Sequence, residues 1–149
     1  MTEKSPFSRI DHVGILVKDL DKAIEYYQSL GIGPFQQIPV DTVINKTMYG
    51  ETSDWQIRAA VAQLGTIKFE LIQPVRGARL MEEFLENKGE GINHVAFAVD
   101  DLDKEVNKLV DKGFKVILSA KRASGHGGVY FDTRQVGDVI LELIQWWPE

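Results

Sequence analysis

Two of the three histidines in this chain of 149 residues lie inside apolar segments that resemble each other. His12 lies in RIDHVGILVKDLDKAI (residues 9–24), and His94 lies in GINHVAFAVDDLDKEV (residues 91–106). An imidazole among apolar side chains costs free energy unless a partner hydrogen-bonds it or a metal ion binds it. For a single histidine, a hydrogen-bonded core position is the commoner explanation. The repetition favours a ligand role instead.

Two glutamates repeat in the same way near the ends of the two halves. KFELIQP (residues 68–74) matches ILELIQW (residues 140–146), which aligns Glu70 with Glu142. Apolar residues flank Glu142 on both faces of its predicted strand, so its carboxylate needs a cation or must keep its proton. Lys68 is a possible partner for Glu70, so a buried salt bridge is the alternative explanation there.

Two imidazoles and two carboxylates, one of each from either half, suit a divalent cation. Mn, Fe, Co, Ni and Zn accept this donor set and leave coordination positions for water or substrate. Because the histidine and the glutamate repeat together, one metal ion explains them more economically than two unrelated ion pairs. The predicted ligands are His12, Glu70, His94 and Glu142.

The repeat also organises the predicted secondary structure. Residues 10–17 and 92–99 alternate like strands, with the histidine and small residues on one face and large apolar residues on the other. The small residues, Gly14 among them, are expected to leave room for a non-protein group. An amphipathic helix follows each strand. The predicted N-caps are Asp19 and Asp101, and the predicted helix ends are Gly31 and Gly113.

Each half then continues with three more strands. They are predicted at 35–46, 55–64 and 67–73 in the first half and at 114–119, 128–133 and 138–146 in the second. A helix at about 77–88 joins the halves. The order βαβββ therefore occurs twice, which predicts an α+β chain in which two curved sheets can face each other. We expect one domain, residues 1–149, with an N-terminal module at about 8–75 and a C-terminal module at about 90–147.

Composition excludes several classes of function. The chain has no cysteine, which excludes disulfides, thiolate ligands and a thiol nucleophile. Its net charge of −5 argues against a nucleic-acid partner, because binding phosphates requires clustered lysine and arginine. The sequence has neither a membrane-length apolar run nor the apolar region of a signal peptide, so we expect a cytoplasmic protein with no membrane partner.

The segments IDHVGILVKDLDKAIEYY, GEGINHVAFAVDDLD and VILELIQ resemble the vicinal oxygen chelate superfamily, also called the glyoxalase/bleomycin resistance/dioxygenase fold. Within it, the resemblance is closest to methylmalonyl-CoA epimerases. It implies two βαβββ modules that form an eight-stranded, cupped, barrel-like mixed sheet around one divalent metal ion. It places the ligands at the four residues named above, and it implies a small-molecule substrate such as an acyl-CoA or another carbonyl compound, and a homodimer.

The resemblance implies an isomerase that moves a proton next to a metal-chelated carbonyl, which requires a base beside the metal. Methylmalonyl-CoA epimerases carry a glutamate in the strand before the second ligand, shortly after a QGV-like turn. The residues that match this position, 57–60, include no acid, and the turn is absent. Glu142 and Glu70 are therefore the candidate catalytic bases, and Glu51 is a weaker one.

Three other functions remain open. A glyoxalase I-like lyase, which acts on a hemithioacetal, is the second candidate. It would likewise use the metal ion to stabilise the negative charge that forms during proton transfer. An extradiol dioxygenase would use two histidines and one glutamate, and Glu70 would crowd its open positions. A non-enzymatic protein that binds a drug would not need four buried ligands.

Three further residues are predicted to contact substrate. The loop RASGHGGVYF (residues 122–131) has backbone N–H groups near Gly127 that can approach an anion, and His126 is a candidate proton shuttle. An exposed loop position is the alternative for His126. Arg58 is a candidate partner for a substrate carboxylate, with a solvated strand residue as the alternative. Four aromatic residues are candidates for lining a pocket or a subunit interface, with packing in the core as the alternative: Tyr49, Trp55, Trp146 and Trp147.

Overall fold

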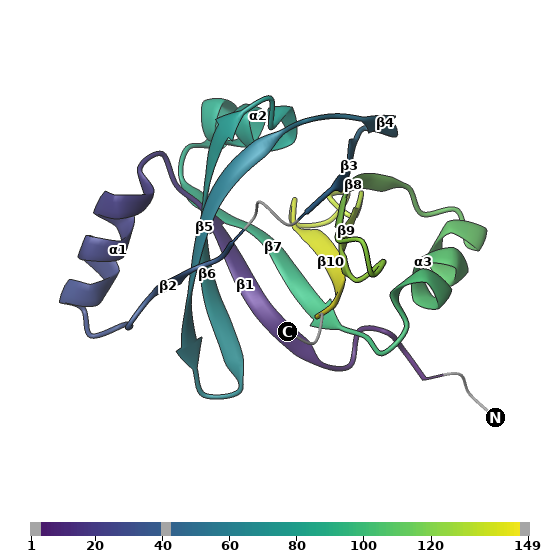
Figure 1. Cartoon of the computed structure of the whole chain (residues 1–149), viewed down its shortest axis with the longest axis horizontal. Coiled ribbons are helices and arrows are strands. Elements are labelled where there is room, and N and C mark those ends of the chain that lie inside the picture. Colours follow the sequence, from purple (N-terminus) through teal and green to yellow (C-terminus); the bar gives the residue numbers. More distant parts are fainter. Residues whose placement is uncertain (1–3, 40–42, 147–149) are drawn as a thin grey trace.

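The computed structural model describes residues 4–39 and 43–146, and its strands form one mixed sheet (Figure 1). The first half contains β1 (Ile10–Leu16), α1 (Leu20–Ser29), β2 (Gln36–Gln37), β3 (Asn45–Met48), β4 (Glu51–Thr52), β5 (Gln56–Leu64) and β6 (Ile67–Arg76). After α2 (Arg79–Lys88), the second half contains β7 (Gly91–Ala98), α3 (Leu102–Asp111), β8 (Val116–Lys121), β9 (Gly127–Phe131) and β10 (Ile140–Gln145). Trp147 lies outside the described residues.

The strand order is β2-β5-β6-β1-β7-β10-β9-β8-β3-β4. The first strands of the two halves, β1 and β7, pair antiparallel at the centre. Each pairs on its other side, in parallel, with the last strand of its own half: β1 with β6 and β7 with β10. Figure 1 shows β5 and β6 on one side of this central pair and β8 to β10 on the other, so the sheet curls into a half-barrel. The predicted α+β class and paired modules are confirmed.

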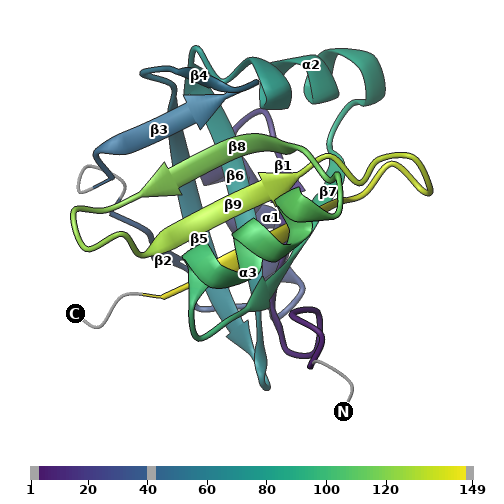
Figure 2. The same ribbon diagram turned by 90° about the vertical axis from the view of Figure 1, so that its right-hand side faces the viewer.

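The sheet has ten strands among the described residues, where eight were predicted. The difference arises mainly at 35–46, which was predicted as one strand. β2 pairs with β5 of its own half, whereas β3 pairs with β8 of the other half (Figure 2). Pro39 follows β2 and has no N–H to donate to a neighbouring strand, so the pairing with β5 ends before it. The β3–β4 hairpin thus ties the first half to the far edge of the second.

The helices after β1 and β7 begin and end where the sequence predicts. The side chains of Asp19 and Asp101 accept hydrogen bonds from the backbone N–H groups of the third residues beyond them, at 3.1 and 3.2 Å. Beyond the two helices, Gly31 and Gly113 have φ values of +94° and +98°, which few other residues adopt. α1 packs against β5 and β6, and α3 packs against β9 and β10.

Apolar side chains form one cluster under each of these helices and a third between the halves. The clusters under α1 and α3 include Leu20 and Leu102. The third cluster combines residues from both halves with the apolar face of α2, which contributes Leu80 and Met81. This third cluster forms the wall of the cup that holds the candidate site. Of the helices in the described ranges, none has the length and apolarity needed to cross a bilayer.

Candidate metal centre

The two halves position their histidine and glutamate by the same strand register. In the parallel pair β1–β6, Glu70 lies two residues beyond the residue that pairs with His12. In the parallel pair β7–β10, Glu142 lies two residues beyond the residue that pairs with His94. Side chains two residues apart on a strand share a face, so each half presents one imidazole and one carboxylate to the inside of the cup. The antiparallel pairing of β1 with β7 then brings the two sets together.

The four side chains converge at nearly equal distances. The Nε2 atoms of His12 and His94 are 3.2 Å apart, and Glu70 Oε1 is 3.3 Å from each of them. Glu142 Oε1 is 3.1 Å from His12 Nε2 and 3.4 Å from His94 Nε2. Donors that each lie about 2.1 Å from one dication at ordinary coordination angles are separated by roughly 3.0–3.4 Å. The spacing of His12, Glu70 and His94 therefore suits a shared cation, and Glu142 is in contact with both imidazoles of that set.

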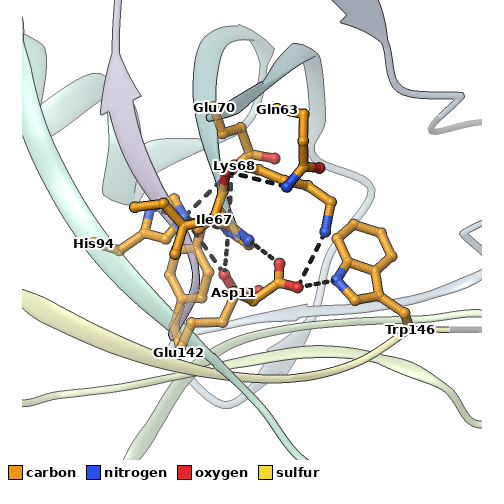
Figure 3. Close-up of polar contacts among 10 residues, drawn as sticks. Asp11, Gln63, Ile67, Lys68, Glu70, His94, Glu142 and Trp146 are labelled. Carbon is orange, nitrogen blue, oxygen red and sulfur yellow. Dashed lines mark hydrogen bonds and ion pairs between the residues drawn. The ribbon is translucent and has the colours of Figure 1, made fainter. Parts of the chain in front are cut away.

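The carboxylates of Glu70 and Glu142 differ in how they join the imidazoles. His12, Glu70 and His94 form a cluster whose ligand atoms all lie within 4.8 Å of one another. Glu142 is not part of that cluster, and Figure 3 shows it on the side of His94 away from Glu70. Glu142 Oε1 nevertheless lies close to both Nε2 atoms.

Burial makes these side chains fit a metal ion better than a set of hydrogen bonds. The exposed fractions are 2% for His12, 7% for Glu70, 0% for His94 and 6% for Glu142. Glu142 Oε1 is buried, and it lies in contact with the Nε2 atoms of both imidazoles. A buried carboxylate costs several kcal/mol unless a cation, either a protonated imidazole or a metal ion, compensates its charge. The donor set and this oxygen therefore match a divalent ion.

The charges in the cluster shift the pKa values of its members. Burial lowers the pKa of His12, but the charge of Glu70 and the hydrogen bond to Asp11 outweigh it and hold that pKa well above 6.5. Burial raises the pKa of Glu70, but the charge of His12 and hydrogen bonds from both imidazoles bring it well below its usual range. A proton on His12 thus balances part of the glutamate charge, and a metal ion would have to displace it.

Two glycines allow the candidate ligands to occupy their positions. A Cβ atom on Gly14 would overlap the imidazole of His94, and one on Gly128 would overlap the carboxylate of Glu142. The expectation that Gly14 leaves room for a non-protein group is therefore wrong, because the ring of His94 fills that space. Gly14 instead makes room for the imidazole of a candidate ligand.

A second layer of polar residues supports His12. Its Nδ1 is 2.7 Å from Asp11 Oδ2. Asp11 Oδ1 accepts hydrogen bonds from Trp146 Nε1 at 2.7 Å and from Lys68 Nζ at 3.1 Å (Figure 3). The sequence-based pairing of Lys68 with Glu70 is wrong, because Lys68 pairs with Asp11. Sequence reasoning overlooked Asp11, although a charged residue inside the apolar segment RIDHVGIL was a signal for it.

Tyr130 is a further residue that the sequence did not single out. Its hydroxyl lies 3.3 Å from Nδ1 and 3.5 Å from Nε2 of His94, and the two ring centroids are 4.8 Å apart. Burial raises the pKa of Tyr130 well above 10, and the charges of Glu142 and Glu70 add to this. The hydroxyl therefore keeps its proton at neutral pH and can donate it in a hydrogen bond.

A cavity of about 100 Å³ adjoins three of the four candidate ligands, His12, Glu70 and Glu142. Its polar lining consists of His12, Glu70, Glu142 and Tyr130, and most of the remaining lining is apolar. Trp55 and Trp146 contribute to the wall, whereas Tyr49 is not among the lining residues and is 37% exposed. Glu51, on β4, is exposed and also outside this lining. Among the described residues, the carboxylates that line the cavity are Glu70 and Glu142.

The structure does not bring the three predicted substrate contacts into this cavity. Arg58 is absent from the lining and extends to α1, where its Nη2 is 3.0 Å from Asp21 Oδ1. His126 is also outside the lining, and its carbonyl accepts from the backbone of the β8–β9 turn. Gly127 is buried where β8 and β9 meet, and a Cβ there would overlap the carbonyl oxygen of Ala120. This glycine permits a close approach of two strands.

Comparison with known proteins identifies the family. The model of the Glyoxalase/Bleomycin resistance protein/Dioxygenase superfamily matches residues 11–131. This range is well over half of the chain, and the chain belongs to this superfamily. The matched range contains His12, Glu70 and His94, and Glu142 follows it. The superfamily resemblance seen in the sequence is therefore confirmed.

Individual relatives are similar over nearly the whole chain. Bacillus subtilis YqjC, an uncharacterised protein, is 28% identical over 141 residues, which cover 93% of this chain and 92% of YqjC. Bovine mitochondrial methylmalonyl-CoA epimerase is 26% identical over 141 residues, which cover 92% of this chain and 74% of the epimerase. The crystal structure of Mycobacterium tuberculosis methylmalonyl-CoA epimerase superposes with a TM-score of 0.71 at 26% identity, covering 99% of this chain and 94% of the other.

Proposed function

We propose that this protein is a divalent-metal-dependent epimerase of the methylmalonyl-CoA epimerase type, which removes and returns a proton next to a carbonyl of an acyl-CoA. The observation that carries the proposal is the convergence of two carboxylates on two imidazoles in a buried cup, with each Oε1 atom 3.1–3.4 Å from both Nε2 atoms. The similarity to epimerases from cattle and Mycobacterium tuberculosis supports the choice of reaction.

The metal would be held by His12, Glu70, His94 and Glu142. An ion of Co, Zn, Mn, Ni or Fe bound there supplies Lewis-acid stabilisation of a substrate carbonyl as it takes up negative charge. Glu70 Oε1 and Glu142 Oε1, each in contact with both Nε2 atoms, are the oxygens that would bind such a cation.

Proton transfer falls to the chain's own carboxylates. Glu142 and Glu70 are the acidic residues of the described cavity lining, so we assign the base to one or both of them. Removing a proton from one face and returning it on the other needs an acid–base group near each face, and Glu70 and Glu142 lie on different sides of His94 (Figure 3). The Tyr130 hydroxyl can donate a hydrogen bond into the same space.

The rest of the cavity keeps water away from the reacting carbon. Trp55, Ile72 and Leu118 belong to its wall, and each is at most 4% exposed. A wall of this kind lowers the local dielectric and strengthens every charge interaction within the cup.

A glyoxalase I-like lyase is the second candidate, and one observation favours it. The position of the epimerase glutamate, residues 57–60, has no acid, and Ile57 and Ala59 line the cavity there. A lyase that uses a ligand carboxylate as its base needs no further acid. Such an enzyme would move a proton between the neighbouring carbons of a hemithioacetal.

Deuterium exchange separates the two candidates. The metal-loaded protein is incubated in D₂O with methylmalonyl-CoA and, separately, with a glutathione hemithioacetal, and mass spectrometry measures deuterium at the carbon next to the carbonyl. Exchange with methylmalonyl-CoA but no turnover of the hemithioacetal supports the epimerase, and the reverse supports the lyase. Protein treated with a chelator and Glu142→Gln are the controls. No exchange with either compound would contradict both. We also expect a homodimer, which sedimentation velocity measures.

A further inference from the structure

The internal repeat differs at the residue before each histidine. The first half has Asp11 before His12, and the second has Asn93 before His94. Both residues are buried, with 8% and 2% of their surface exposed. Asp11 Oδ2 lies 2.7 Å from Nδ1 of His12, whereas Asn93 Oδ1 lies 3.3 Å from Nδ1 of His94. One imidazole therefore has a close anionic partner, and the other has a more distant neutral one.

Donors from two other strands fix the orientation of the Asp11 carboxylate. Lys68 reaches it from β6, and Trp146 reaches it from the residue after β10. Both donate to Oδ1, which leaves Oδ2 for His12 (Figure 3). The Lys68 ammonium also lies 5.0 Å from the centre of a Trp146 ring, so the two donors support each other. Asp11 is thus held by side chains from β6 and from the end of β10.

An imidazole that donates its Nδ1 proton to a carboxylate keeps the lone pair on Nε2 for a metal ion, and the carboxylate makes that nitrogen more basic. In this protein the Nε2 of His12 faces Glu70, Glu142 and His94. Asn93 gives His94 no comparable charge.

We propose that Asp11 is a positioning residue that makes His12 the stronger and more rigidly oriented of the two imidazole ligands. The two halves of the site are then unequal, although their strands and ligands repeat. This inference rests on the proposed metal site.

The test compares Asp11→Asn with Lys68→Met. The first replaces the carboxylate with the amide that the second half carries, and the second removes the ion pair but leaves Asp11 beside His12. Titration with Co²⁺, followed by its visible absorption, measures affinity. We expect Asp11→Asn to bind Co²⁺ about 10–100-fold more weakly than the unchanged protein. Lys68→Met should stay within about threefold of it, because the hydrogen bond to His12 remains.

Nitrogen-15 NMR of the unchanged protein gives a readout that needs no variant. With Co²⁺ replaced by diamagnetic Zn²⁺, the His12 ring should carry its proton on Nδ1, with a downfield proton signal from the short hydrogen bond. The signal should move upfield in Asp11→Asn and stay in place in Lys68→Met. Circular dichroism verifies that both variants fold.

The outcomes separate this inference from the proposed function. Equal Co²⁺ affinity in Asp11→Asn and the unchanged protein would overturn the role of Asp11 and leave the metal site intact. An equal loss in Lys68→Met would also overturn it, because the ion pair would then be responsible. A proton on Nε2 of His12 in the zinc-loaded protein would do the same without any variant. Failure of the unchanged protein to bind Co²⁺ would refute the metal site itself, and this inference with it.

Discussion

Replacing Gly14 with alanine tests directly whether the position of His94 makes the metal site. Gly14 lies in β1 opposite His94 in β7, and an added Cβ would overlap the imidazole ring. Ordinary contacts between heavy atoms need about 3.5–4.0 Å, so the ring would have to move by more than about 1 Å. Metal–ligand distances tolerate only about 0.2 Å of error. The variant should therefore lose His94 as a ligand.

The expected changes differ in size for stability and for metal affinity. Overpacking a buried site costs about 1–3 kcal/mol, and a glycine-to-alanine change offsets about 0.4–1 kcal/mol of this by restricting the unfolded chain. We expect Gly14→Ala to lower the free energy of unfolding by about 1–2 kcal/mol without metal. Because even changes behind a ligand weaken metal binding about 10–100-fold, the loss of a ligand should exceed about 100-fold.

Gly91→Ala is the matched control, since Gly91 lies in β7, the strand of His94, and a Cβ on it meets nothing within 4 Å. Urea unfolding in the presence of a chelator measures stability, and Co²⁺ titration measures affinity. The control should stay within about 0.5 kcal/mol and bind normally. A Gly14→Ala protein that binds Co²⁺ as tightly as Gly91→Ala would refute the argument, because His94 would then not need its observed position.

Three further predictions follow from the same geometry. His94→Ala and Glu142→Ala should fold but retain no metal after purification, as measured by elemental analysis, and full occupancy in both would exclude them as ligands. In metal-free protein the raised pKa of His12 makes its charge stabilising below about pH 6.5, and this stabilisation is lost as the pH rises through the folded value. The thermal midpoint in chelator should therefore drop between about pH 6 and about pH 9, whereas the drop should be smaller in His12→Gln; equal pH curves would contradict this. Arg58→Ala should keep kcat/KM for the active substrate within about threefold, because Arg58 pairs with Asp21 away from the cavity, and a larger loss would restore it as a substrate contact.

Much of the fold was predictable because the repeat carries information that local propensity lacks. Each half places a polar residue at the same point of an apolar strand, and the aspartate caps and terminal glycines of two helices repeat with them. Alternation with period two assigns side chains to faces, so the repeat predicted that His12 and Glu70 face the same space as His94 and Glu142.

The differences concern contacts between distant segments. Residues 35–46 have the composition of one strand, but β3 finds its partner in β8, which lies more than 65 residues further along the chain. Lys68 shares a face with Glu70 within β6, yet its position opposite His12 places it next to Asp11 of the neighbouring strand. The outward orientation of Arg58 could have been predicted from the sequence. Its neighbours Ile57 and Ala59 are apolar and line the cavity, and adjacent residues of a strand point to opposite faces.

The proposed reaction depends on how the two carboxylates of the cup are held. A four-ligand site with two carboxylates leaves a dication with little net positive charge, so its power to acidify a substrate depends on how firmly each carboxylate stays bound. Glu70 is in contact with both imidazoles, and its low pKa marks a carboxylate held strongly in its charged form. Glu142 Oε1 is in contact with the same two Nε2 atoms, and Gly128 beside Glu142 allows its carboxylate to lie close to β9. The protein contacts of the two candidate bases are therefore nearly equivalent, as the internal repeat predicts, so the assignment of the base depends on which carboxylate lies nearer the reacting carbon of the substrate.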